Sequence, residues 1–331
     1  MLPLVLRALC WTWWGRLRRG PARPSWTWRL ELALRLSRLR AAAIERLDVR
    51  GRRLALERGA RPLPPRLVAA VERQRLALGH LEAERLAPVS GSSGAAILYL
   101  HGGSFSGGSS RTHRELLARL CLAARAAVFA PDYRLAPEYR YPAAIDDAVA
   151  IYRQLLDRGL DPRRLALAGD EAGGNLALAL LQRLRDGHAP LPAAAALLSP
   201  WVDLAASGGS LVDNAACDLA DPEDLVRWAE LYAPRAEMRH PLVSPLYADL
   251  RGLPPLLVEV GGAEILRDQV REFVDRARGQ GVEVDFTERV DMVHDCYLLA
   301  GQLDSCARAL QMVGEWIAGR LAGASVEALL G

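Results

Sequence analysis

A glycine-rich stretch of the chain has the residue types that can bind a developing negative charge. It reads HGGSFSGG and spans residues 101–108. Glycine lets a backbone turn tightly and direct successive N–H groups at one oxygen, and each well-placed donor is worth roughly 3–4 kcal/mol to an oxyanion. A phosphate-binding loop would instead need Gly-Lys-Ser/Thr, and the chain contains no lysine. We therefore predict that Gly102, Gly103 and Ser104 present N–H groups to a reacting carbonyl.

A second stretch, GDEAGGN at residues 169–175, has the pattern of a sharp turn between a strand and a helix. The apolar run RLALAG precedes it, and a helical pattern follows it directly. In the related pattern G-x-S-x-G, such a turn presents a nucleophilic serine at the top of a sheet. Here the central position is Glu171, between Asp170 and Ala172. We expect the Ala172 N–H group to belong to the same set of donors.

Both stretches follow short apolar runs that we interpret as buried strands. The runs lie at residues 95–100, 126–133, 164–169, 193–200 and 255–261, and a last strand is predicted at 283–289. Amphipathic helical stretches separate several of them, at Thr112–Arg125, Ala143–Arg158 and Gly174–Asp186. This alternation predicts an α/β fold with a doubly wound, mostly parallel sheet and helices on both faces. Ligands bind such a sheet beyond the carboxyl ends of its strands, where both stretches lie.

The 331 residues divide by composition into two parts. Residues 1–90 are basic and rich in tryptophan, with 19 Arg against 7 acidic residues, and we predict an N-terminal helical cap there. Its helices are expected at residues 26–59 and 65–86. Residues 91–331 are predicted to form the core, with a helical cap insertion near 205–240. Within the insertion, Asp221 before Pro222 predicts a helix start.

Together these motifs resemble those of the hormone-sensitive-lipase family of carboxylesterases and lipases. HGGSF is similar to the family's oxyanion motif, and GDEAGGN is similar to its GDSAGGN. The stretch APDYRLAPEYRYPAAIDD (130–147) resembles its DYRLAPE-x-x-x-PAA-x-DD signature. The likeness continues through LLSPWVDL, LPPLLVEVGGAEILRD and MVH, so it covers about residue 90 to the C-terminus. It implies the α/β-hydrolase fold with a helical cap, and hydrolysis of an ester.

The resemblance also implies the remaining catalytic residues. His294, in the MVH motif after the last predicted strand, takes the place of the catalytic histidine. Glu264 takes the place of the aspartate that orients the imidazole, with Asp268 as the second candidate. His101 and Asp170 are expected to support the site. The other histidines, His80, His113, His188 and His240, are given no role.

Glu171 changes what such a site can do. A carboxylate attacking an acyl carbon would give an anhydride, so ordinary serine-dependent esterase activity is expected to be impaired. We also expect Glu171 to form an ion pair with His294 and to raise the pKa of the imidazole.

Three alternatives stay open for a chain with this residue. The first is hydrolysis in altered form, with Glu171 activating a water or attacking an alkyl carbon, as the elbow aspartate of related hydrolases attacks halides and epoxides. The second is a catalytically inactive pseudoenzyme or small-ligand receptor on the same fold. The third is a sporadic or engineered substitution in an ordinary esterase. Retention of His294 and Glu264 favours an enzyme, because a binding pocket does not need a histidine–carboxylate pair.

The composition bounds the partners and the compartment. A formal net charge of only +3 does not suggest a nucleic-acid partner. The Trp-rich helices predict a small apolar substrate or ligand, and the mixture of Trp and Arg in residues 11–29 also suits peripheral contact with a membrane. Five scattered cysteines without a CxxC pair indicate neither a zinc site nor disulfides, and fit a reducing, cytoplasmic setting. No metal or other cofactor is expected, and the oligomeric state is not predicted.

Overall fold

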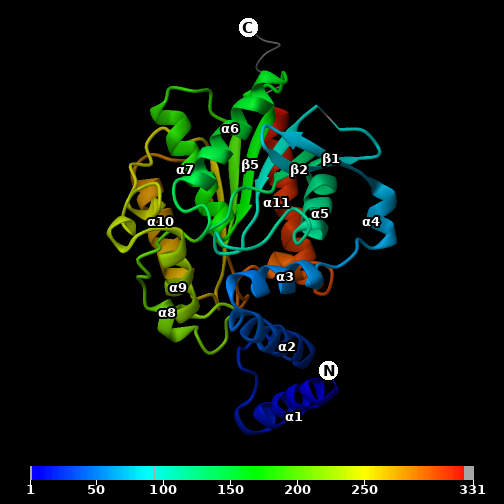
Figure 1. Ribbon diagram of the computed structural model, residues 1–331. Helices are drawn as coiled ribbons and strands as arrows, with labels where there is room; N and C mark the ends of the chain where they lie inside the picture. The colour runs from blue at the N-terminus through cyan, green and yellow to red at the C-terminus, as the bar shows by residue number, and fades with distance from the viewer. Residues whose placement is uncertain (1, 93, 324–331) are drawn as a thin grey trace.

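An eight-stranded sheet forms the centre of the protein. The computed structural model describes residues 2–92 and 94–323 (Figure 1). The strands are β1 (Val71–Leu78), β2 (Leu81–Pro88), β3 (Ala96–Leu100), β4 (Ala127–Pro131), β5 (Leu165–Asp170), β6 (Ala194–Leu198), β7 (Leu256–Gly261) and β8 (Val284–Arg289). Their order in the sheet is β1-β2-β4-β3-β5-β6-β7-β8. The pairs β1–β2 and β2–β4 are antiparallel and the other five are parallel, which confirms the predicted fold class.

Helices cover both faces of this sheet, so the central strands are apolar on both sides. The covering helices are α5 (Arg114–Ala124), α6 (Ala143–Asp157), α7 (Ala172–Asp186), α10 (Arg267–Gly279) and α11 (Asp304–Gly323). Alternate residues of β3 face opposite ways: Ile97 and Tyr99 pack in the cluster that contains α5 and α11. Leu98 and Leu100 pack in the cluster that contains α6, α7 and α10. The six predicted strands are all confirmed, with ends that differ by one or two residues.

The predicted helix over residues 65–86 is wrong. The chain forms only a short helix there, α4 (Pro65–Ala70), and then the antiparallel hairpin β1–β2. Gly79 has a φ of +62° and makes the tight turn between the two strands. The spacing of apolar residues alone does not reveal this turn. Residues 71–88 therefore belong to the sheet and not to a helical cap.

The N-terminal helices form a stack beyond the carboxyl ends of the parallel strands (Figure 1). They are α1 (Leu2–Arg19), α2 (Trp28–Glu45) and α3 (Val49–Gly59). Thr27 and Asp48 cap the last two by accepting N–H bonds from Leu30 and Gly51. The second cap segment consists of α8 (Ser210–Asp213) and α9 (Pro222–Tyr232), and Asp221 caps α9 as predicted. Among the described residues, none of the helices has both the length and the apolar character that crossing a bilayer requires.

The packing of α7 on the sheet gives a test of the fold. A Cβ atom added to Gly173 would lie 1.9 Å from the carbonyl oxygen of Leu100, so alanine can enter only if α7 moves off β3. We expect Gly173→Ala to lower the free energy of unfolding by about 2 kcal/mol or more, measured by chemical denaturation. Gly319→Ala in α11 is the control, because a Cβ there meets nothing within 4 Å. Equal stability of the two variants would contradict the close approach of α7 to β3.

Candidate active site

The turn between β5 and α7 holds Glu171 in a strained backbone conformation. Its φ is +49° and its ψ is −113°, values that cost a non-glycine residue about 1–3 kcal/mol. Neighbouring segments hold the turn in place: the Glu171 N–H donates to the carbonyl of Leu198, and the Glu171 carbonyl accepts from Asn175 and Trp201. The backbone at this position is therefore set by the fold and not by the side chain it carries.

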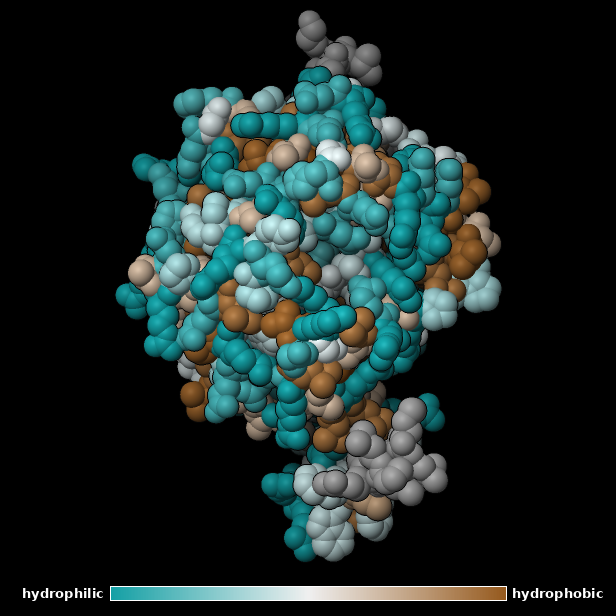
Figure 2. All heavy atoms as spheres, in the orientation of Figure 1, coloured by the Kyte–Doolittle hydropathy of each residue, from teal (hydrophilic) through white to brown (hydrophobic). Residues whose placement is uncertain are grey.

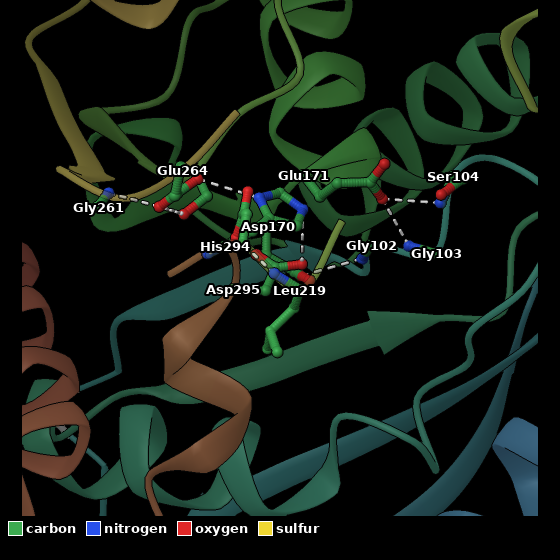
Figure 3. Close-up of polar contacts among 12 residues, drawn as sticks. Gly102, Gly103, Ser104, Asp170, Glu171, Leu219, Gly261, Glu264, His294 and Asp295 are labelled. Carbon is green, nitrogen blue, oxygen red and sulfur yellow. Dashed lines mark hydrogen bonds and ion pairs between the residues drawn. The ribbon is translucent and has the colours of Figure 1, made fainter. Parts of the chain in front are cut away.

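The carboxylate of Glu171 lies against the glycine-rich loop. Its Oε2 accepts hydrogen bonds from the N–H groups of Gly103, at 2.8 Å, and Ser104, at 2.7 Å (Figure 3). Its Oε1 is buried and has no hydrogen-bond partner, and the residue is 3% exposed. One oxygen of the side chain thus occupies the two backbone donors, and the other is buried without a hydrogen-bond partner.

Two of the donors predicted for this loop behave differently. The N–H of Gly102 donates to Asp170 Oδ1 at 3.0 Å, so it faces away from Glu171. The prediction that Gly102 presents its N–H group to a reacting carbonyl is therefore wrong. Ala172 is the first residue of α7 and is fully buried, and no hydrogen bond from its N–H reaches Glu171.

His294 lies between two carboxylates. Its Nδ1 is 3.0 Å from Glu264 Oε2, and its Nε2 is 3.5 Å from Asp295 Oδ2. Glu264 is fixed in turn by Ser199, whose hydroxyl donates to Oε1 at 2.6 Å, and by the N–H of Gly261. The imidazole is thereby held in one orientation at the end of the sheet.

The expected ion pair between Glu171 and His294 is not formed. The described ion pairs of His294 are those with Glu264 and Asp295. The two N–H groups of the loop attract the Glu171 carboxylate away from the imidazole (Figure 3). The sequence motif identified the turn but could not show which neighbour the longer side chain would prefer.

The charges around His294 determine its protonation. Burial alone would lower its pKa, but Asp295, the hydrogen bond with Glu264 and the nearby Asp218 together raise the pKa well above its usual value. The pKa of Asp295 is also raised, by burial and by the negative charges of Asp170, Glu171 and Glu264, against the opposing effect of His294. His294 and Asp295 therefore each hold a proton more tightly than the free side chains do.

Asp268, the second candidate for the acid, does not contact His294. It accepts the N–H of Ser210 at 2.8 Å and pairs with Arg267 at 2.8 Å, at the start of α10. Its function is to join the cap segment to the core. Glu264 is the carboxylate that reaches the imidazole.

A buried network positions the glycine-rich loop from behind. Asp170 accepts hydrogen bonds from Tyr99 Oη at 2.7 Å and from the Gly102 N–H, and its Oδ2 lies 3.0 Å from His113 Nε2. Burial would lower the pKa of His113, but Asp170 raises it, so the two form an ion pair. The His101 ring stacks on Tyr133, and burial lowers its pKa to about 4, which keeps it neutral. His101 and Asp170 thus lie beside the glycine-rich loop, and their supporting role stays a prediction.

Three residues in the site were not predicted from the sequence. Asp218 accepts hydrogen bonds from the N–H groups of His294 and Ile265, both at 2.7 Å. It thereby joins the cap segment to the loop that contains His294. The sequence predicts no role for His113, and none for Asp295. The position of Asp295 directly after His294 was a usable signal, whereas Asp218 and His113 come from distant segments and carried none.

These side chains surround a cavity of about 420 Å³. Gly103, Ser104, Glu171, His294 and Asp295 line its floor. Its walls come from α2, α3, the cap segment and the 3-10 helix that follows His294, and their large apolar residues are Ile44, Leu56, Leu219, Leu225, Leu298 and Leu299. None of the α1 side chains that the structure describes, those of residues 9–19, lines it. Within the described ranges, no group of three His, Cys, Asp or Glu side chains is placed to hold a metal ion.

The position of Asp295 gives a prediction for the titration of His294. Asp295→Asn removes a negative charge beside Nε2, so the imidazole should bind its proton less tightly and its pKa should fall. The measurement is the pH titration of isotope-labelled histidine by NMR. Asp304→Asn, at an exposed carboxylate that starts α11, should leave the His294 titration unchanged. A titration of His294 that is the same in all three proteins would show that Asp295 does not face the ring.

Comparison with known proteins agrees with this architecture. Residues 97–298 match a family model described as an alpha/beta hydrolase fold. The chain is similar to an acetyl-hydrolase of Streptomyces hygroscopicus, with 44% identity over 276 residues that cover 82% of this chain and 90% of that protein. It is also 33% identical to the putative acetyl-hydrolase LipR of Mycobacterium tuberculosis, covering 84% of this chain and 90% of the relative. A solved esterase from the bacterial hormone-sensitive lipase family superposes with a TM-score of 0.85 at 40% identity, covering 90% of this chain and 99% of that one. The chain therefore belongs to the α/β-hydrolase fold and, within it, to the hormone-sensitive-lipase family.

Proposed function

We propose that the cavity is a hydrolase site for a small apolar ester or related molecule, in which the carboxylate of Glu171 replaces the nucleophilic serine. The observation that carries this proposal is that the two carboxylate oxygens of Glu171 have different surroundings. Oε2 is held by the Gly103 and Ser104 N–H groups, and Oε1 is buried without a partner. His294 and Glu264 line or adjoin the same cavity, and the relatives named above are esterases and acetyl-hydrolases.

This arrangement disfavours the acyl chemistry that a serine would perform. The donors of Gly103 and Ser104 would have to stabilise the oxyanion of the substrate, and Glu171 already occupies them. Attack of a carboxylate on an acyl carbon would also give an anhydride. The carboxylate of Glu171 therefore suits attack on an alkyl carbon better than attack on an ester carbonyl.

An epoxide fits the protonation state of the site. Oε1 of Glu171 attacks an epoxide carbon, the carbon–oxygen bond breaks, and the epoxide oxygen takes the proton of His294. The neutral imidazole then removes a proton from water, whose oxygen adds to the Glu171 carboxyl carbon. Oε2 becomes the oxyanion, held by the two N–H groups that already contact it. The carbon–oxygen bond to the enzyme then breaks, and His294 protonates the leaving alkoxide, which releases a diol. Transfer of the remaining carboxyl proton from Glu171 to His294 restores the starting state.

A second candidate is a small-ligand receptor without turnover. The contact between Asp295 and His294 Nε2 favours it, because a permanently protonated imidazole cannot activate water. The cavity and its apolar walls would then serve binding alone. The two candidates differ in whether a covalent intermediate forms at Glu171.

Restoring serine tests the scaffold. We expect Glu171→Ser to raise the hydrolysis of p-nitrophenyl acetate by about a thousandfold or more over the parent protein, because a serine there would use His294 and the freed N–H groups. Glu171→Gln is the matched control, since it removes the charge without supplying a nucleophile and should gain nothing. The double variant Glu171→Ser, His294→Ala should lose the gained activity. A folded Glu171→Ser protein that stays inert would refute the assignment of the catalytic positions.

Trapping the intermediate tests the chemistry of Glu171 itself. His294→Ala removes the base for the second step, so incubation with 1-bromobutane should leave a butyl ester that intact-mass spectrometry detects. Peptide mapping should place the added mass on Glu171 and not on a cysteine. The same treatment of Glu171→Gln, His294→Ala should give no adduct on that peptide. If Glu171 is never alkylated while an apolar ligand raises the melting temperature, the receptor candidate is correct.

A further inference from the structure

The outermost helix, α1, exposes several large apolar side chains. Trp11, Trp13 and Trp14 are 64%, 66% and 53% exposed, and Leu17 is 63% exposed. Trp28, at the start of α2, is 53% exposed and shares a hollow of about 540 Å³ with Trp13 and Leu17. In Figure 2 this region projects from the lower end of the molecule, and brown and pale side chains lie there among teal ones. These residues, with the arginines between them, are called the Trp/Arg surface below.

The active site does not account for this exposure. Among the N-terminal helices, α2 and α3 line the cavity, and none of the described α1 side chains, those of residues 9–19, does so. The α1 helix instead packs on α2 from outside. The sequence left open whether the tryptophans cover the substrate or face a membrane, and the structure leaves them out of the substrate cavity.

The charge of the Trp/Arg surface is of one sign. Residues 1–30 contain six arginines and no acidic residue. Arg18 lies over the ring of Trp14 at 4.3 Å, and Arg29 lies over the ring of Trp28 at 5.9 Å. Among the described residues, neither of these arginines forms an ion pair with a carboxylate. Guanidinium groups beside amphipathic indole rings are the chemistry that binds anionic headgroups at the boundary with the acyl chains.

The surface is held in a fixed orientation on the core. Arg16 bridges α1 to α2 through Glu31 at 2.8 Å and donates to the carbonyl of Trp26 at 3.0 Å. The buried Trp26 donates from Nε1 to the carbonyl of Asp291, three residues before His294. Hydrogen bonds and an ion pair therefore connect the helix that carries the exposed tryptophans to the loop that contains His294.

We propose that the Trp/Arg surface docks the protein on an anionic lipid bilayer, with α1 lying in the plane of the interface. Self-association through the same surface would bring two sets of arginines together without acidic partners, so charge favours lipid over a second copy. Because α2 carries Trp28 at its start and lines the cavity with Ser37, Ala41 and Ile44, docking brings the cavity close to the membrane.

Co-sedimentation of the full chain with vesicles tests this surface. We expect binding to vesicles that contain phosphatidylglycerol, much less binding to pure phosphatidylcholine, and loss of binding as salt is raised to about 0.5 M. Brominated lipids should quench tryptophan fluorescence in the bound state. The charge variant Arg18→Glu, Arg19→Glu should bind at least tenfold more weakly, and Trp13→Ala, Trp14→Ala should reduce both binding and quenching.

Matched controls separate these effects from a general change in charge or apolar area. Arg235→Glu, Arg251→Glu makes the same charge change at exposed arginines elsewhere, and Val290→Ala, Met312→Ala removes exposed apolar area elsewhere. Both should bind vesicles as the parent does, and thermal unfolding should show that all variants are folded. The proposal is overturned if the parent does not bind anionic vesicles or if the charge controls weaken binding equally. It is also overturned if light scattering shows a dimer that the Trp variants dissociate while vesicles do not bind.

Discussion

Two hydrogen bonds from the glycine-rich loop to Glu171 Oε2 connect the parts of the site. They join the glycine-rich loop after β3 to the turn after β5. The negative charge of Glu171 is thus bound by a loop that follows the neighbouring strand. A buried carboxylate is costly unless it is hydrogen-bonded, and backbone donors meet that requirement without adding a counterion. Because these donors satisfy the charge, His294 does not have to pair with Glu171 and remains paired with Glu264 and Asp295.

Further buried carboxylates support the site, and each has a different set of hydrogen-bond donors or ion-pair partners. Asp170 has an ion pair with His113 and hydrogen bonds from Tyr99 and Gly102, while Asp218 has only backbone donors. Segments distant in sequence are thus joined through buried acids rather than through apolar contacts alone. Buried polar groups of this kind stabilise a structure where they are hydrogen-bonded, and Asp170 and Asp218 meet that condition.

The sequence was most informative where a local pattern determines the structure. Five apolar runs predicted five of the strands because buried parallel strands are apolar on both faces, and the turn around Glu171 was recognisable because small residues must flank it. The β1–β2 hairpin was missed because its leucines occur at spacings that also suit a helix, and only tertiary pairing with β4 decides between the two. The direction of the Glu171 side chain, and the roles of Asp218 and His113, depend on contacts between distant segments. No pattern within one segment could show them.

The tethered carboxylate also bears on which molecules can share the cavity. A free acid that seeks the Gly103 and Ser104 donors must displace a group attached to the same chain, whose effective concentration is high. A neutral molecule meets no such competition and gains the apolar walls. At these two donors a free acid is therefore at a disadvantage against a neutral molecule, although the cationic side chains of Arg40, Arg52 and Arg61 also line the cavity.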